Sequence, residues 1–116
     1  MDANCFQTPA LLVHLDRVRA NVQAMLRHVG GNAKRWRPHV KTCKVPQVLE
    51  LLLAAGVHRF KVATTRELAV LLESAGAAHP IDVLVALAHH GANRQRVLDL
   101  AAAHPVHRVS MLSEDP

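Results

Sequence analysis

The sequence has little aromatic surface and no long apolar run. Its 116 residues include no tyrosine, two phenylalanines and one tryptophan. Proteins that bind single-stranded nucleic acid usually stack bases on aromatic rings, so this shortage argues against nucleic acid as a partner despite a formal net charge of +5. The longest fully apolar run, Val83 to Ala88, is far shorter than the roughly 20 residues that span a bilayer, and no membrane segment is expected.

Cysteine and targeting signals are also scarce. Cys5 and Cys43 form no CxxC pair, and we expect both thiols to be free, as a reducing compartment allows. The first four residues have neither a basic start nor a long apolar stretch, which does not resemble a secretory signal and favours a cytoplasmic protein. With 50% hydrophobic and 20% charged residues, residues 1–116 are expected to form one soluble globular domain.

The apolar residues repeat a strand–helix pattern. Apolar positions three and four residues apart mark helices, and the near-continuous apolar run at 81–88 is typical of a parallel strand covered on both faces. The expected strands are residues 10–15, 34–41, 59–64, 81–88 and 106–112. The expected helices begin near Asp16, Pro46, Thr64 and Asn93 and end at Gly30–Gly31, Gly56, Gly76 and His104–Pro105.

The spacing of the units predicts an α/β fold with a parallel sheet. The expected strand ends at Lys41, Thr64, Ala88 and Leu112 recur at intervals of 23 or 24 residues. Such units build either an open doubly wound sheet or a closed (β/α)₈ barrel, and the glycine-rich phosphate turn of the open sheet is absent after Lys41. A complete barrel takes about 250 residues, so we expect an incomplete TIM-type barrel with about four of eight units.

A row of basic side chains distinguishes residues 34–41. Strand alternation places Arg35, Arg37, His39 and Lys41 on one side. Burying such cations without partners costs several kcal/mol each, so the row indicates an anionic ligand or an internal ion network. Lys41 comes last, at the carboxyl end of its strand, where ligands gather in α/β folds. It is a candidate Schiff-base amine, with a plain solvated lysine as the alternative.

The same segment resembles a known family. Residues 37–44, Arg-Pro-His-Val-Lys-Thr-Cys-Lys, with Thr8–Val13 before them and Phe60–Thr64 after them, are similar to the N-terminal barrel of fold-type III pyridoxal-phosphate enzymes. Within that group the chain looks most like the D-threonine aldolase branch, which is related to the alanine racemase N-terminal domain. The resemblance implies a (β/α)₈ barrel followed by a β domain, and chemistry on D-amino or related amino acids.

The resemblance also implies roles for individual residues. Lys41 corresponds to the lysine that holds pyridoxal 5′-phosphate as an internal aldimine, in an aldolase or a racemase, and it would be both catalytic and cofactor-binding. His39 would support Lys41 or the cofactor ring, or else be a packed structural histidine. Arg37 would contact the cofactor phosphate or be an internal charge partner. The substrate would be a small amino acid, and no metal ligand set is expected.

The chain departs from the family pattern at two places. Cys43 stands where the aldolase branch usually has histidine, and we interpret it as a small buried residue rather than a reactive thiol. The later barrel strands, the main phosphate loops and the C-terminal domain do not follow the fourth barrel strand. We therefore expect little or no activity from the chain alone, and pairing of its open sheet edges with another copy or a complementing second half.

Two expectations concern the remaining polar residues. His89 and His90 are adjacent and point to different sides of an extended chain, so they lack zinc-ligand spacing. Glu67, Glu73 and Asp99 lie on expected helices and are interpreted as solvent-facing. The alternative function for the chain is an inactive remnant or binding module that uses the basic strand face for an anion or a partner.

Overall fold

Eight short elements make up the fold. The structure is a computed structural model that describes residues 5, 7–41 and 43–114. In chain order the elements are α1 (Leu15–His28), the 3₁₀ turn η2 (Ala33–Arg35), α2 (Pro46–Ala54), β1 (Arg59–Val62), α3 (Thr65–Ala75), β2 (Asp82–Val85), α4 (Gly91–Ala103) and β3 (Arg108–Met111). Within the described ranges, none of the helices combines the length and the apolar character needed to cross a membrane.

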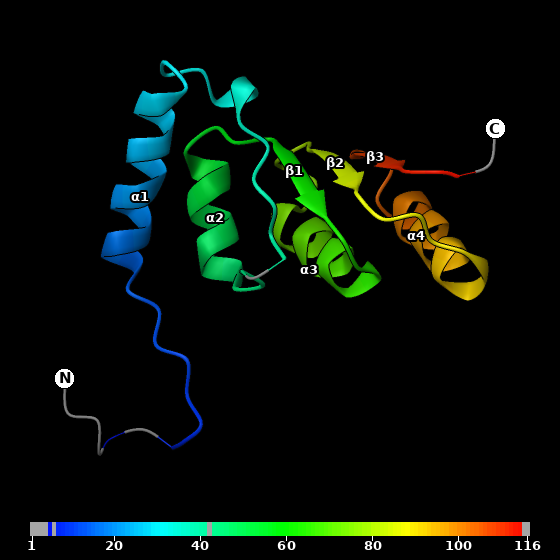
Figure 1. The fold of residues 1–116 in the computed structure, drawn as a ribbon, viewed down its shortest axis with the longest axis horizontal. Coiled ribbons are helices and arrows are strands. Elements are labelled where there is room, and N and C mark those ends of the chain that lie inside the picture. Colours follow the sequence, from blue (N-terminus) through cyan, green and yellow to red (C-terminus); the bar gives the residue numbers. More distant parts are fainter. Residues whose placement is uncertain (1–4, 6, 42, 115–116) are drawn as a thin grey trace.

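The strands form a parallel three-stranded sheet in the order β1-β2-β3. The register aligns the first residues of the strands, Arg59, Asp82 and Arg108, in one row. All carboxyl ends therefore meet at one edge of the sheet and all amino ends at the other (Figure 1). This confirms the predicted parallel βα units. The strands that the structure describes form an open sheet and do not close a barrel.

One face of the sheet carries the helices and the core. The helices pack in chain order, α1 on α2, α2 on α3 and α3 on α4, with α3 and α4 beneath the strands (Figure 1). Alternate strand residues, Phe60, Val62, Val83 and Val85, are fully buried in this layer. Burial of each such side chain stabilises the fold by about 2 kcal/mol. Their neighbours on the other face, such as Leu84, are only partly buried, so the expected double-sided cover of residues 81–88 is wrong within this structure.

Glycines end the first two helices in the predicted way. After α1, the Gly30 N–H donates to the Arg27 carbonyl and the Gly31 N–H to the Leu26 carbonyl. After α2, the Gly56 N–H donates to the Leu53 carbonyl and the Val57 N–H to the Leu52 carbonyl. This Schellman pattern requires a left-handed residue, and Gly30 and Gly56 have φ of +71° and +81°.

Two predicted strands are wrong. Residues 10–14 have no regular structure, and the Leu11 side chain is 80% exposed, because no neighbouring strand pairs with this segment in the described residues. Residues 34–41 are not a strand either: η2 occupies the start of the segment, and only His39 makes an isolated parallel bridge, to Lys61. Alternation in sequence was present here, but a strand also needs a continuous ladder of backbone hydrogen bonds.

Two predicted helix caps are also wrong. α1 begins at Leu15, with His14 before it, and Asp16 lies inside the first turn instead of capping it. α4 begins at Gly91 instead of following Asn93, and its N-cap residue makes no side-chain hydrogen bond. Both helices begin earlier than their best capping residue because their first turns close on backbone carbonyls, His14 in α1 and His90 in α4.

His107 is a buried polar side chain just before β3. Its Nδ1 accepts a hydrogen bond of 3.4 Å from the Ile81 N–H, and its Nε2 is buried without a hydrogen-bond partner among the described residues. Burial, with a smaller contribution from His104, holds the pKa of His107 below its ordinary value of 6.5. Because the unfolded chain takes up this proton more readily, protonation favours unfolding.

We expect the free energy of unfolding to fall as the pH drops through 6.5 towards the lower pKa of folded His107. His107→Asn keeps an acceptor for the Ile81 N–H and removes the titration, so its stability should depend less on pH in this window. Chemical denaturation at several pH values between 5 and 8 measures the difference. His28→Asn, at an exposed position of α1, is the matched control. Parallel pH curves for the wild type and His107→Asn would contradict the assignment.

Candidate functional site

Lys41 lies at the carboxyl edge of the sheet. The Lys61 N–H donates to the Pro38 carbonyl at 2.9 Å, and the Val40 N–H donates to the Lys61 carbonyl at 3.0 Å. These two bonds hold the segment beside β1 and parallel to it, with His39 opposite Lys61. Lys41 follows this bridge and is exposed. Its amine is therefore carried on a tethered backbone at the edge where the sequence predicted a ligand.

His39 is tied to Lys41 through the backbone. The Lys41 N–H donates to His39 Nδ1 at 3.2 Å, which leaves the ring proton on Nε2 when the imidazole is neutral. The His39 side chain is exposed, so the alternative of a packed structural histidine is wrong. Thr42, which belongs to the motif, lies outside the described residues. Cys43, which was expected to be buried, is half-buried, and both cysteines are free thiols.

Glu67 is the buried carboxylate of this edge. Its side chain is 3% exposed, although it was expected to face solvent. The Ala63 N–H donates to Glu67 Oε2 at 2.7 Å, and the Glu67 N–H donates to Thr64 Oγ1 at 3.2 Å. This is the predicted capping pair at the start of α3, with the carboxylate reaching one residue further back than usual. The cap is the reason that the carboxylate turns inward.

Contacts of Glu67 and of its hydrogen-bond partner Ala63 link three segments at this edge. Lys44 Nζ lies 3.8 Å from Glu67 Oε1, which links the segment after Lys41 to the β1–α3 loop. His89 Nε2 lies 2.9 Å from the Ala63 carbonyl, which links that loop to the segment before α4. Burial raises the pKa of Glu67, but the hydrogen bonds from Ala63 and Thr64, together with Lys44, outweigh it and hold the pKa below its ordinary value. Glu67 is therefore an anion at neutral pH.

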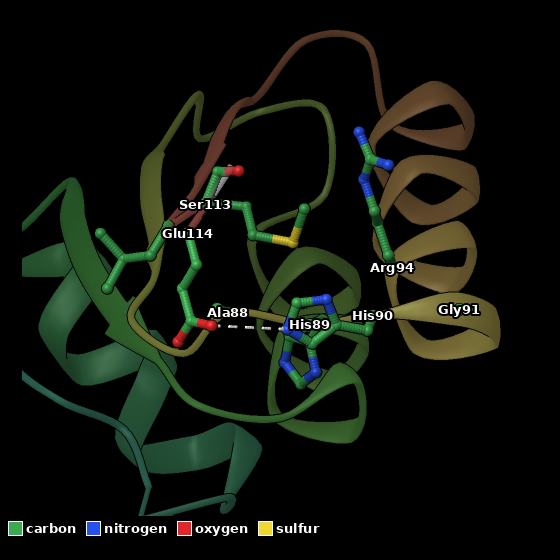
Figure 2. Close-up of a pocket in the computed structure, with 9 residues that line it drawn as sticks. Ala88, His89, His90, Gly91, Arg94, Ser113 and Glu114 are labelled. Carbon is green, nitrogen blue, oxygen red and sulfur yellow. Dashed lines mark ion pairs between the residues drawn. The ribbon is translucent and has the colours of Figure 1, made fainter. Parts of the chain in front are cut away.

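A small pocket of about 80 Å³ opens beyond β2 and β3 at the same edge. Figure 2 shows His89, His90, Gly91 and Arg94 on the α4 side and Ser113 and Glu114 on the β3 side. His90 Nε2 lies 3.9 Å from Glu114 Oε2. The two histidines have different partners, because His89 Nε2 lies beside the Ala63 carbonyl. In the described ranges, no group of three or more His, Cys, Asp or Glu side chains is placed to hold a metal ion.

Arg37 lies at the opposite, amino edge. Its Nη1 and Nη2 bind both carboxylate oxygens of Asp82 at 3.1 and 3.0 Å, and Nη1 also donates to the carbonyls of Phe60 and Asp82. These bonds from Arg37 hold the pKa of Asp82 below its ordinary value, against the effect of burial, with smaller contributions from Arg108 and Arg59. The Arg37 guanidinium thus reaches from the segment before the His39–Lys61 bridge to Asp82 in β2. Arg37 is therefore an internal charge partner, one of the two roles that the sequence left open.

The structure thus separates the predicted row of basic residues. Lys41 and His39 lie together at the carboxyl edge, whereas Arg37 is held near the strand starts and Arg35 belongs to η2. Neither Glu67 nor Asp82 was expected as a partner of these basic residues. The capping spacing of Thr64 and Glu67 was a usable signal for Glu67. No local signal identified Asp82, because its partner is 45 residues away.

Comparison with known proteins gives one family and one relative. The family model of the alanine racemase N-terminal domain matches residues 13–114. D-threo-3-hydroxyaspartate dehydratase from Delftia sp. (strain HT23) is 36% identical over 80 residues, which cover 69% of this chain and 20% of the dehydratase. The aligned part thus accounts for about a fifth of the curated relative's length. No solved structure matches the chain significantly.

We expect Arg37→Lys to lower the free energy of unfolding by about 2 kcal/mol, because lysine cannot bind Asp82 with two parallel bonds and leaves a half-buried carboxylate with a poorer partner. Urea unfolding monitored by circular dichroism measures the change. Arg96→Lys, on the exposed surface of α4, should cost less than 0.5 kcal/mol on the same scale, about the size of a surface substitution. Equal effects of the two variants would show that the Arg37–Asp82 pair does not stabilise the sheet.

Replacing Glu67 tests the buried carboxylate. Glu67→Gln keeps an acceptor for the Ala63 N–H but removes the charge, and we expect a loss of about 1 kcal/mol at neutral pH. The wild type should also lose stability as the pH falls from 4.5 through the lower folded pKa, since the carboxylate contributes only while it is ionised. Glu67→Gln should show a shallower acid slope. Glu73→Gln, at an exposed position of the same helix, is the control. If stability falls with acid as steeply in Glu67→Gln as in Glu73→Gln, Glu67 does not have this role.

Proposed function

This chain belongs to the alanine racemase N-terminal domain family of fold-type III pyridoxal-phosphate enzymes, and we propose that it binds pyridoxal 5′-phosphate covalently through Lys41 as part of an amino-acid lyase or racemase. The observation that carries the proposal is the position of Lys41, exposed and tethered beside β1 at the carboxyl edge of a parallel sheet. Ligands of α/β folds gather at this edge. When bound, the cofactor supplies an electron sink for a bond that breaks at the substrate α-carbon.

The residues at the carboxyl edge fit such a cofactor. An aldehyde needs an accessible primary amine, and the exposed side chain of Lys41 provides one. Lys44, three residues on, faces Glu67, whereas in the part of the chain that the structure describes no carboxylate forms an ion pair with Lys41. Glu67 is thus paired with Lys44 and not with Lys41. This pairing supports Lys41 as the reacting amine of the segment.

The neighbouring side chains have separate tasks in this proposal. Lys41 Nζ binds the cofactor and exchanges a proton with the substrate. His39, oriented by the Lys41 N–H, presents Nε2 as a hydrogen-bond donor to the cofactor or to Lys41. A direct contact between Arg37 and the cofactor stays a prediction, and its bonds to Asp82 favour support of the sheet instead.

The reaction is proposed from the family and the relative. The relative is named as a dehydratase of a D-configured hydroxy amino acid, and the motif around Lys41 resembles the D-threonine aldolase branch. Both are consistent with a small D-amino acid as substrate and with cleavage, elimination or racemisation at its α-carbon. A cytoplasmic location and association with a second copy or a second chain remain part of the proposal.

A second candidate function is an anion- or partner-binding module without catalysis. It is favoured by the face of the sheet that carries no helix, where Lys61 lies beside the segment that leads to Lys41. Such binding should weaken steeply with salt, since it depends on the release of counterions, whereas a covalent bond to Lys41 should not.

We expect borohydride reduction in the presence of pyridoxal phosphate to label Lys41 stoichiometrically. Peptide mass mapping locates the label, and visible absorption before reduction at low and high salt gives an independent readout. Lys41→Arg keeps the charge and should abolish the label, while Lys61→Arg, on the neighbouring strand, should retain it. Labelling spread over several lysines, or unchanged in Lys41→Arg, would overturn the proposal.

A further inference from the structure

A basic cleft lies at the amino edge of the sheet, at the opposite end of the strands from Lys41. It is open to solvent and has a volume of about 430 Å³, within the range of small-molecule sites. Its wall is formed by the starts of all three strands and the residues just before them. The lining residues are Lys34, Gly56, His58, Arg59, Pro80, Ile81, Asp82, Val106 and Arg108.

Positive charge is in excess in this cleft. The strand register places Asp82 between Arg59 and Arg108, and both arginines act on the carboxylate electrostatically. The ion pair of Asp82, however, is made with Arg37, which binds both of its oxygens. Arg37 already balances the charge of Asp82. Arg59 and Arg108 therefore remain as cations that no ion pair with a described carboxylate neutralises.

The guanidinium groups keep donors available for a ligand. Arg59 uses Nη1 to donate to the Lys34 carbonyl at 3.0 Å, which anchors the side chain and brings η2 to the cleft. A guanidinium has five N–H donors, so most of those of Arg59 are left. Lys34, which also lines the cleft, is a third basic residue. Arginine pairs suit the geometry of phosphate oxygens. The side chains of Pro80, Ile81 and Val106 provide an apolar wall beside them.

We propose that this amino-edge cleft is a binding site for a phosphate group, held by Arg59, Arg108 and Lys34. The ligand is either free phosphate or a small phosphate monoester whose carbon part lies against the apolar wall. A dianion offsets the excess charge left by the Arg37–Asp82 pair. The site is separate from the proposed cofactor amine, because Lys41 follows the bridge towards the carboxyl edge.

The test is titration of the full chain with inorganic phosphate and with phenyl phosphate at constant ionic strength, followed by amide NMR. Saturable shifts are expected at the amides of Lys34, Arg59 and Arg108. Tighter binding of phenyl phosphate identifies a monoester, and equal affinity identifies free phosphate. Either result supports a phosphate site in the cleft.

Variants distinguish the cleft from general attraction to a basic protein. Arg108→Gln should weaken phosphate binding about tenfold, the loss of a charge-assisted contact. Lys34→Gln, at an exposed position, should weaken it about threefold and serves if the strand variant does not fold. Arg96→Gln removes the same charge from α4 and should change the affinity less than twofold.

Two results would overturn the proposal: equal loss of affinity in Arg96→Gln and the cleft variants, or shifts that do not saturate and are reproduced by chloride. Because none of these substitutions alters Lys41, labelling of Lys41 by pyridoxal phosphate remains a separate readout. A failure of the phosphate site can thus be told from a failure of the proposed function.

Discussion

Parallel pairing of three four-residue strands places every strand start at one edge of the sheet and every strand end at the other. A parallel ladder allows no tight hairpin, so each connection must cross over, usually through a helix. Here α3 and α4 make these crossovers and lie on the same face, beneath the strands (Figure 1). The helices and the core therefore occupy one side, and the polar residues are left on the other face and at the two edges.

The two edges differ in how their carboxylates are used. At the carboxyl edge, Glu67 is buried by the cap of α3 and faces Lys44, while Lys41 stays exposed. At the amino edge, Asp82 is bound by Arg37 among several arginines. Each edge holds one buried or half-buried carboxylate with a dedicated cation, and the remaining cations are available for ligands. This distribution of charge underlies both proposals, a covalent cofactor at one edge and a phosphate group at the other.

The bridge between His39 and Lys61 decides how the chain presents Lys41, the amine of the proposed cofactor site. Two backbone hydrogen bonds to Lys61 attach the segment to β1, and Lys41 follows directly. The segment need not be a full strand for this purpose. A short tether positions the backbone of Lys41 while the side chain stays exposed, as the proposed covalent binding of a cofactor requires.

The amino-acid sequence by itself determined the parallel βα units and the glycines that end the first two helices, and it singled out Lys41 as the candidate amine. These features depend on local periodicity and short-range backbone geometry, which residues close in the chain specify. The tertiary structure decided that residues 10–14 and most of 34–41 form no strand, since a strand exists only where another strand pairs with it. It also decided the partners of Arg37 and Glu67 and the burial of His107. Those outcomes depend on contacts such as the one between Arg37 and Asp82, 45 residues apart, which the crossover of the chain creates and no local pattern encodes.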